Sequence, residues 1–479
     1  MLAKDFEKVI WLEIHVRIKS KTKMFCNCKN AIVLADEPNL NVCPICMWFP
    51  GMLPTLNEEV VRLWLIGWMM MNCKVNKVSR FDRKTYFYPD NPLSYQITQM
   101  YEPIVWIWSV KTLVNWKVKE FSIHHMHLEN DAWKLVHVWG KTLCDYNRAW
   151  SPLMEIVTNP VFSDKEEVME FLKELQKMFR ASGVSDADME KWQLRCDVNI
   201  SVRPIWETKF WTRVELKNIN SFSSIWRAID TEFARQVRIL DEWWKVNQET
   251  RGWDDDKGVS ITQRSKEDAM DYRYFPEPDL LPIVLEDNFI DECRKSLPEL
   301  PIEKRLRYLN EFKLAEDDAR ILSADYALWS YFDKVVTLSG DAKKSCAYIT
   351  TVVLSLMKEK NIDDINTIKI TPEELSKVIK MVNADELSST NAKIVIEELF
   401  KNWGQSRLIA TERNLIQKND LWALEIIVDS VINSNSTQVA DYKLWNEKIF
   451  GFLVGQCMKA SAGVWNPKIF NEILKKKLN

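Results

Sequence analysis

The chain has 479 residues, a length that predicts two or three domains rather than one. Apolar residues make up 46% of it and charged residues 28%, which excludes a disordered tail. The 65 basic and 68 acidic side chains give a net charge of −3, which excludes a polycationic nucleic-acid coat but allows a local basic patch. No apolar run reaches the roughly 18 residues of a membrane span, and the N-terminus lacks a signal-peptide pattern. We therefore expect a cytoplasmic protein without a membrane partner.

Glycine is scarce in this sequence and tryptophan is abundant, with 11 and 22 residues respectively. Glycine normally makes up about 7% of a protein, and here only the two counts together approach that share. Some tryptophans, such as Trp116 and Trp243, fall in short connections where glycine is the usual residue. We hypothesise that most of these positions are glycines, specified by UGA codons in a code that assigns UGA to glycine. The alternative is an unusually tryptophan-rich protein.

The first expected strand covers residues 9–18. Leu12 and Ile14 point to one face of this strand, so Glu13 and His15 share the other face. The pattern predicts a strand with an apolar face in the core and a charged face outside it.

Two pairs of cysteines follow, Cys26-x-Cys28 and, after 14 intervening residues, Cys43-x-x-Cys46. Thiolates on two tight turns at this separation suit a tetrahedral zinc ion. Four thiolates leave no open coordination position, so the site would be structural. We predict a zinc-ribbon-like insertion over residues 26–46, with ordinary reduced thiols as the alternative.

Polar and apolar residues alternate in three later segments as well. The polar positions are His125, His127, Glu129 and Asp131, then Asp197, Asn199 and Ser201, and finally Arg213, Glu215 and Lys217. A solvated outer face would explain any one such strand. If all these strands belong to one sheet, they form a carboxylate-rich surface that suits Mg²⁺ or Mn²⁺ and phosphoryl transfer from ATP. A P-loop motif and a G-x-S-x-G motif are both missing, which excludes a P-loop kinase and leaves a serine hydrolase without support.

The chain divides into segments of different character. Residues 1–295 are mixed strand and helix, and a double-proline stretch at 296–301 is the best domain boundary. We expect a helical domain over residues 296–404. A small helical tail at 405–479 ends in the basic run Lys475 to Lys477.

The segments together resemble the B subunits of the tRNA-dependent aspartyl/glutamyl-tRNA amidotransferases. The motifs that carry the resemblance include Leu12-Glu13-Ile14-His15-Val16, Cys26-x-Cys28, Cys43-Pro44-x-Cys46, His127-Leu128-Glu129, Asp145-Tyr146-Asn147-Arg148-Ala149, Leu194-Arg195-Cys196-Asp197 and Gln248-Glu249-Thr250-Arg251. The resemblance covers the whole chain. It also supports the glycine hypothesis, because this chain has tryptophan at Trp133 and Trp150 where the family has glycine. Trp253, by contrast, falls where the family has tryptophan.

The resemblance implies an α+β fold: a mainly antiparallel-sheet cradle like that of glutamine synthetase, followed by all-α helical and tail domains. It implies an ATP-dependent, glutamine-hydrolysing carbon–nitrogen ligase. The side-chain carboxylate of Glu-tRNA(Gln) or Asp-tRNA(Asn) would be phosphorylated, then amidated with ammonia channelled from the amidase partner of the complex. A third, small partner would complete a heterotrimer, and the tail would bind the tRNA. The rival interpretation is a non-catalytic zinc-ribbon tRNA-binding protein that retains the fold.

The resemblance also implies roles for individual residues. The catalytic set would be Glu13, His15, Glu129, Asp197, Glu215 and Lys84. Mg²⁺ ligands would be Glu13, His15, Glu129, Glu155 and Asp197, and the ATP-binding set would be Arg80, Arg148, Glu155, Asn199 and Lys217. One departure is Asn130, which replaces an acidic residue of the family and is a weaker metal ligand. A real indole at Trp133 would crowd a loop expected near the nucleotide.

Overall fold

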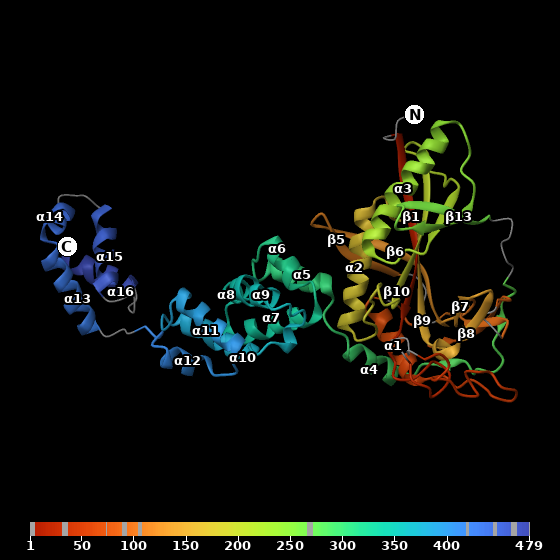
Figure 1. Cartoon of the computed structure of the whole chain (residues 1–479), viewed down its shortest axis with the longest axis horizontal. Helices are drawn as coiled ribbons and strands as arrows, with labels where there is room; N and C mark the ends of the chain where they lie inside the picture. Colours follow the sequence, from red (N-terminus) through yellow and green to blue (C-terminus); the bar gives the residue numbers. More distant parts are fainter. Residues whose placement is uncertain are drawn as a thin grey trace. The chain divides into compact units, whose positions relative to one another are not determined.

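The computed structural model describes residues 5–30, 37–72, 74–88, 93–103, 108–265, 272–417, 421–443, 448–460 and 467–478. The chain forms two compact units, Met1–Glu303 and Lys304–Asn479. The first unit contains a large sheet and the second is helical (Figure 1).

An eight-stranded sheet forms the centre of the first unit. Its strand order is β13-β12-β11-β10-β1-β9-β6-β5. The strands are β1 (Phe6–Arg17), β5 (Trp108–Val114), β6 (Lys117–Asn130), β9 (Pro152–Thr158), β10 (Leu194–Pro204), β11 (Arg213–Lys217), β12 (Glu249–Asp254) and β13 (Val259–Ser265). All neighbouring pairs are antiparallel except β11 and β12. The predicted α+β class with a mainly antiparallel sheet is therefore confirmed.

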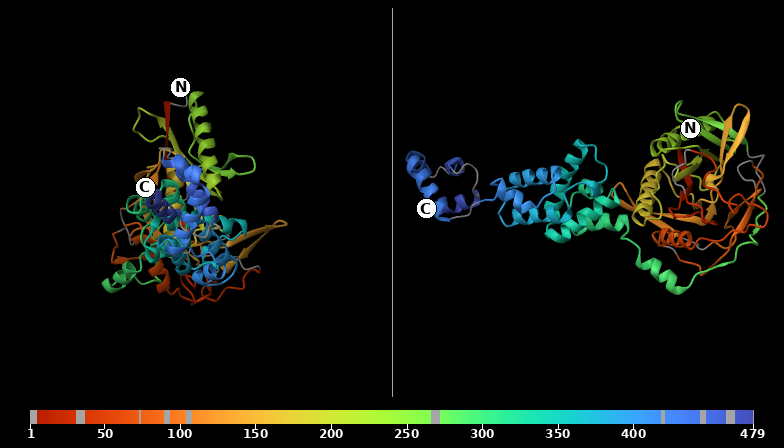
Figure 2. Two further views of the ribbon diagram at one scale, coloured as in Figure 1. Left: turned by 90° about the vertical axis from the view of Figure 1, so that its left-hand side faces the viewer. Right: turned by 60° about the horizontal axis from the view of Figure 1, so that its bottom comes forward.

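Two helices cover one face of this sheet. Helix α2 (Lys165–Ala181) packs on β5, and α3 (Phe222–Asp241) packs on β10 and contacts α2 (Figures 1 and 2). The alternating pattern predicted for the first strand is confirmed, because Leu12 and Ile14 are fully buried in the core. Burying these side chains against the helices directs Glu13 and His15 to the opposite face.

Smaller elements complete the first unit. They are α1 (Glu58–Met69), α4 (Asp287–Lys295), the three-stranded sheet of β14 (Phe275–Pro276), β3 (Asp82–Thr85) and β4 (Tyr95–Thr98), and the pairs β2 (Val78–Ser79) with β15 (Ile283–Val284) and β7 (Lys134–Val138) with β8 (Lys141–Asp145). Strand β4 contacts β6. Through this contact the three-stranded sheet brings Lys84 toward the charged face of the central sheet.

The second unit contains two separate apolar cores. One involves α5 (Pro301–Asn310), α6 (Glu316–Leu322), α7 (Tyr326–Ser339), α8 (Ala342–Tyr348), α9 (Leu354–Glu359), α10 (Pro372–Asn383), α11 (Ser389–Lys401) and α12 (Ser406–Glu412). The other involves α13 (Leu421–Ser434), α14 (Ser436–Lys443), α15 (Lys448–Ala460) and α16 (Pro467–Leu478). Ala410 of α12 belongs to the first core, so the tail core begins with α13. Among the helices described in both units, none combines the length and apolar character of a membrane span.

Tryptophan recurs where the backbone has a positive φ. Six described tryptophans and six described asparagines adopt it; the tryptophans are Trp48, Trp116, Trp139, Trp150, Trp192 and Trp243. Asparagine is enriched at such positions, whereas a bulky side chain is strained there. The distribution is therefore unusual for tryptophan and ordinary for glycine.

The ends of α2 and α3 make this contrast direct. After α2, Gly183 has a φ of +71°, its N–H donates to the carbonyl of Arg180, and the next N–H donates to the carbonyl of Phe179. After α3, Trp243 has a φ of +63°, and the N–H groups of Trp243 and Trp244 make the equivalent pair of bonds. This is the Schellman arrangement, which usually has glycine at the left-handed position. Trp243 thus occupies the place that Gly183 occupies in the neighbouring helix.

Candidate active site and cysteine cluster

The charged face of the sheet is assembled by strand register. Glu13 of β1 lies opposite Asp197 of β10, and His15 lies opposite Glu155 of β9. His127 of β6 lies opposite Glu155 from the other side. Because directly opposed residues in an antiparallel pair share a face, these side chains form one continuous polar surface across four strands.

A cavity of about 540 Å³ opens over this surface. Its lining includes six of the predicted site residues: Glu13, His15, Lys84, Glu129, Glu215 and Lys217. It also includes residues that were not expected at the site, among them Gln96, Arg195, Thr250 and Tyr272. Thr250 and Arg195 lie in motifs quoted for the family resemblance, which is the signal that could have identified them.

Two imidazoles and two carboxylates meet beside the cavity. His127 Nε2 lies 3.2 Å from Glu155 Oε2 and 3.5 Å from Glu129 Oε2, and His15 Nε2 lies 3.5 Å from a carboxylate oxygen of each. Burial lowers the pKa of His127, but Glu155 and Glu129 outweigh it and raise this pKa to about 10. Glu155 is buried too, and the two histidines hold its pKa well below the usual range. Burial and the nearby Glu155 raise the pKa of Glu13 to about 7.

Lysines balance the carboxylates at both sides of the cavity. Lys217 Nζ lies 2.5 Å from Asp197 Oδ2 and 2.8 Å from Glu215 Oε1. Burial opposes the charge of Lys84, but Glu129 and Glu155 more than offset this and raise its pKa. Burial likewise opposes the charge of Lys217, but Asp197 and Glu215 outweigh it and raise its pKa, so both lysines are cationic at neutral pH.

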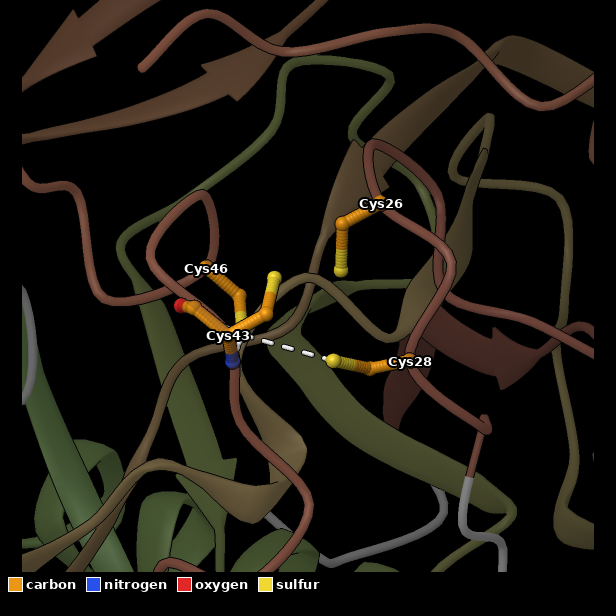
Figure 3. Close-up of side chains that lie close together, drawn as sticks. All are labelled: Cys26, Cys28, Cys43 and Cys46. Atoms are coloured by element: carbon orange, nitrogen blue, oxygen red, sulfur yellow. Dashed lines mark hydrogen bonds between the residues drawn. The ribbon is translucent and has the colours of Figure 1, made fainter. Parts of the chain in front are cut away.

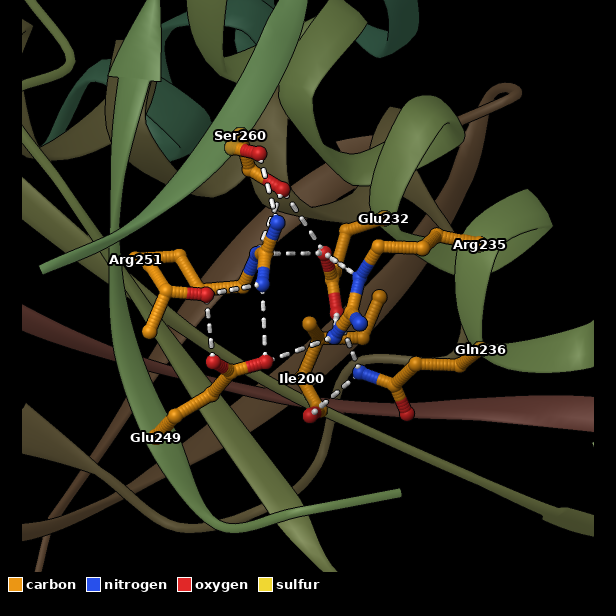
Figure 4. Close-up of polar contacts among 8 residues, drawn as sticks. Ile200, Glu232, Arg235, Gln236, Glu249, Arg251 and Ser260 are labelled. Carbon is orange, nitrogen blue, oxygen red and sulfur yellow. Dashed lines mark hydrogen bonds and ion pairs between the residues drawn. The ribbon is translucent and has the colours of Figure 1, made fainter. Parts of the chain in front are cut away.

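A hydrogen-bonded network holds β12 in place behind Glu215. Thr250 Oγ1 donates to Glu215 Oε2 at 2.9 Å. The residues on either side of Thr250, Glu249 and Arg251, are fixed to α3. Each carboxylate of the pair Glu249 and Glu232 lies within ion-pair distance of both Arg251 and Arg235, and Glu232, which like Arg235 belongs to α3, is fully buried (Figure 4). This network positions Thr250, and through it the carboxylate of Glu215.

Three arginines converge on a single buried carboxylate at the edge of the cavity. Asp131 is 1% exposed and lies 3.0 Å from Arg17 and 3.2 Å from both Arg148 and Arg195. Burial raises the pKa of Asp131, but the arginines outweigh it and keep this pKa well below normal. Arg148 also donates to the carbonyl of Ala132. Only Arg195 of the three lines the cavity.

Four further predicted site residues do not line the cavity: Glu155, Asp197, Arg80 and Asn199. Arg80 is about half exposed and forms an ion pair with Glu102 at 3.2 Å. Asn199 is 4% exposed and lies opposite Glu215 in the sheet. Arg80 and Asn199 were both expected in the ATP-binding set, but neither is among the residues that form the cavity wall.

The two departures noted in the sequence have structural explanations. Asn130 Oδ1 accepts a hydrogen bond from the Ile97 N–H at 2.8 Å, and its Nδ2 donates to the carbonyl of Asp131. Asn130 is buried and joins β6 to β4, and it does not line the cavity. Trp133 is 5% exposed and packs edge-on against Tyr146, with ring centroids 4.2 Å apart.

The four cysteines of the predicted insertion come together in space. The sulfur atoms of Cys26, Cys28, Cys43 and Cys46 all lie within 4.8 Å of one another, and their thiols point toward a common centre (Figure 3). Cys28 Sγ and Cys46 Sγ are 4.0 Å apart, close to the roughly 3.8 Å edge of a tetrahedron with Zn–S bonds of about 2.3 Å. A hydrogen bond from Cys26 lowers the pKa of Cys46 to about 5. The cluster can hold a metal ion.

The sequence matches known proteins along nearly its whole length. A family model described as "GatB/GatE catalytic domain" matches residues 8–291, and one described as "GatB domain" matches residues 330–478. The B subunit of the aspartyl/glutamyl-tRNA(Asn/Gln) amidotransferase of Persephonella marina is 43% identical, over 99% of this chain and all of its own length. A B subunit of the same enzyme from Clostridium acetobutylicum is 42% identical over the same shares. The chain belongs to the family of aspartyl/glutamyl-tRNA(Asn/Gln) amidotransferase B subunits.

Proposed function

We propose that the chain activates the side-chain carboxylate of Glu-tRNA(Gln), Asp-tRNA(Asn) or both by ATP-dependent phosphorylation, and that ammonia from the amidase partner then displaces the phosphate. The observation that carries the proposal is the charged cavity on the central sheet, where Glu13, Glu129 and Glu215 face Lys84 and Lys217. Carboxylates beside cations are the side chains that phosphoryl transfer from a nucleotide requires.

The donor set fits Mg²⁺. It offers carboxylate oxygens from Glu13, Glu129, Glu155 and Asp197 with the imidazole of His15, and oxygen-rich sets are those that hard cations prefer. Glu129 Oε2 is buried and makes no hydrogen bond among the described residues; its ion-pair partner is the imidazole of His127, 3.5 Å away. When bound, Mg²⁺ neutralises the charge of the phosphate oxygens.

The chain's own cations would bind and orient the two reactants. Lys84 and Arg195 line the cavity on different strands, and each can offset the charge of a phosphate or of the substrate carboxylate. Asp131 positions Arg195 by accepting its hydrogen bond. Thr250 holds Glu215 in one orientation.

We also propose that the cysteine cluster binds zinc as a structural site. Four thiolates would satisfy the ion fully and leave no position for a substrate. The cluster packs against the main core of the first unit, so zinc would fix this insertion beside the sheet.

The proposed complex has two protein partners and a tRNA. The amidase and the third, small protein would be the partners in a cytoplasmic heterotrimer, and the tail over residues 405–479 would bind the tRNA. The basic run of Lys475 to Lys477 lies in the last turn of α16. It would contact phosphates, so its loss should reduce the salt dependence of tRNA binding.

Reconstitution with the two partner proteins tests the function. The complex is assayed for tRNA-dependent ATP hydrolysis and amidation with Glu-tRNA(Gln) and Asp-tRNA(Asn) separately. Asp197→Asn should retain tRNA affinity and lose acyl-phosphate formation, because a neutral amide is a poor Mg²⁺ ligand. Full ATP turnover in this variant would contradict the assignment, and tRNA binding without any turnover in the wild type would favour the non-catalytic alternative.

We further propose that most tryptophans of the sequence are glycines in the native protein. Support comes from the six tryptophans with positive φ and from the equivalent helix ends at Gly183 and Trp243. Trp253 is an exception: its indole N–H donates to Asp255 at 2.7 Å, and it is 7% exposed in an extended strand.

Peptide masses of the protein from its native source test this proposal, with glycine expected at position 243 and tryptophan at 253. In the recombinant chain, Trp243→Gly should raise stability by about 1 kcal/mol, because a left-handed backbone costs a bulky residue about that much and the indole is 88% exposed. Trp253→Gly should lower stability. Tryptophan found at position 243 in the native peptide would refute the recoding.

A further inference from the structure

A second group of metal-type ligands lies on β6, beside the residues proposed for Mg²⁺. His125 and His127 are two residues apart on this strand, so both imidazoles project from the same face. Glu155 of β9 lies directly opposite His127. One donor atom from each of the three residues lies within 4.8 Å of the other two.

The chemistry of this group differs from that of the Mg²⁺ set. It offers two imidazole nitrogens and one carboxylate, and imidazole is a ligand that zinc, nickel and cobalt accept and magnesium does not prefer. The rings of His125 and His127 are nearly parallel, at 14°, with centroids 5.6 Å apart. Both rings are therefore arranged side by side rather than turned away from each other.

An unpartnered nitrogen supports a ligand at this place. His127 is 7% exposed, and its Nδ1 is buried without a hydrogen-bond partner among the described residues. A buried polar atom without a partner is costly. Its Nε2 is already within ion-pair distance of Glu155 and Glu129, so a metal ion at Nδ1 would replace the proton on that nitrogen and release it to solvent.

We propose that His125, His127 and Glu155 form a binding site for a divalent transition-metal ion, which in the cell would be Zn²⁺. This site is distinct from the cysteine cluster. Glu155 also belongs to the Mg²⁺ set, so an ion bound here competes for that carboxylate. On the basis of the proposed function, transition-metal ions would inhibit the carboxylate-activating reaction through this site.

Cobalt titration of the full-length chain tests the site. The cysteine cluster is first saturated with Zn²⁺, and Co²⁺ is then added while its visible absorption is followed. We expect one further equivalent to bind without the intense charge-transfer band of a cobalt thiolate. His125→Ala should weaken this binding at least tenfold, and His125→Gln, which keeps more of the side-chain volume, should do the same.

Two matched variants locate the ion. His137→Ala removes an exposed imidazole of β7 that contacts Thr142, and it should leave Co²⁺ affinity unchanged. His15→Ala removes the imidazole of the Mg²⁺ set and should weaken Co²⁺ binding less than about twofold. Unchanged Co²⁺ affinity in both His125 variants, or loss of binding only in His15→Ala, would overturn the proposal.

The proposed function is tested separately from this site. Zn²⁺ in excess over the cysteine cluster should inhibit Mg²⁺-dependent ATP turnover of the assembled complex, and His125→Gln should relieve that inhibition. If the complex shows no turnover at all, the proposed function fails while the cobalt titration still decides the metal site.

Discussion

The cysteine cluster and the charged sheet face can both hold a cation, but they are built in opposite ways. The four thiols come from two short turns separated by 14 residues. The charged face takes its residues from five strands and from β3, across positions 13 to 217. The cysteine cluster forms once its two turns fold next to each other, whereas the charged sheet face forms only when every strand is in register. The two regions should therefore respond differently to single substitutions.

The largest effect is expected from breaking the local site. Cys43→Ser removes one thiolate from the cluster, and the chain should lose its stoichiometric zinc and a large part of its stability. Metal analysis and thermal denaturation measure both quantities. Cys144→Ser changes a cysteine outside the cluster and should keep the zinc. Wild-type protein purified without any zinc would contradict the prediction.

The next largest effect is expected from the buried Asp131 carboxylate, which orients three arginines at the edge of the sheet face. Asp131→Asn leaves Arg17, Arg148 and Arg195 without their shared carboxylate and should cost about 3–5 kcal/mol of unfolding free energy, as for a broken buried ion pair. Urea denaturation measures the loss. Asp186→Asn removes the exposed partner of Lys19 and should cost less than about 1 kcal/mol. Equal losses of unfolding free energy in the two variants would show that the buried Asp131 carboxylate stabilises the fold no more than an exposed one does.

A smaller effect should appear in activity without loss of the fold. Thr250→Val removes the hydrogen bond to Glu215. A hydrogen bond to a charged group contributes about 1.5–3 kcal/mol, so tRNA-dependent ATP turnover should fall by about tenfold or more. Thr262→Val, at a threonine that contacts Glu249 instead, should change turnover by less than about twofold. A larger loss of ATP turnover in Thr262→Val than in Thr250→Val would show that the important contact lies outside the cavity.

The smallest effect concerns the helix packed behind the charged face. Glu167 of α2 accepts hydrogen bonds from Lys119 and Ser163, and despite its burial these lower its pKa. A carboxylate with a lowered pKa stabilises the fold fully above its unfolded pKa of about 4.3, and this contribution is lost as the pH falls from there through the lower pKa of the folded protein. Glu167→Gln should thus cost about 1 kcal/mol at pH 7, and this cost should shrink as the pH falls through the pKa of the folded carboxyl group. A stability difference independent of pH would contradict this origin.

Local patterns in the sequence predicted most of the fold correctly. Alternation placed Leu12 and Ile14 in the core and Glu13 and His15 on the other face, as found. The start of α10 is also a local feature, because Thr371 accepts a hydrogen bond from the N–H of Glu374 three residues later. These features depend on neighbours within a few residues, which is why a single sequence contains them.

Long-range partners could not be predicted in the same way. The family resemblance implied that Arg148 and Arg80 bind ATP, but it could not indicate their partners in the fold, which are Asp131 for Arg148 and Glu102 for Arg80. Thr250 and Gln96 entered the cavity wall only through the pairing of β12 with β11 and of β4 with β3. The ion-pair partner of each basic side chain depends on the order of the strands in the sheet, and no local sequence pattern predicts that order.

The sequence by itself determined the spacing of the cysteines, the apolar and charged faces of each strand, and the excess of tryptophan over glycine. The tertiary structure decided the rest. It brought Glu155 between His15 and His127, tied Asn130 to β4, and showed that Trp243 stands in the left-handed position that Gly183 fills elsewhere. The physical reason is that periodicity and spacing describe residues within one element. Ion pairs, buried polar atoms without partners and backbone strain arise only when separate elements pack together.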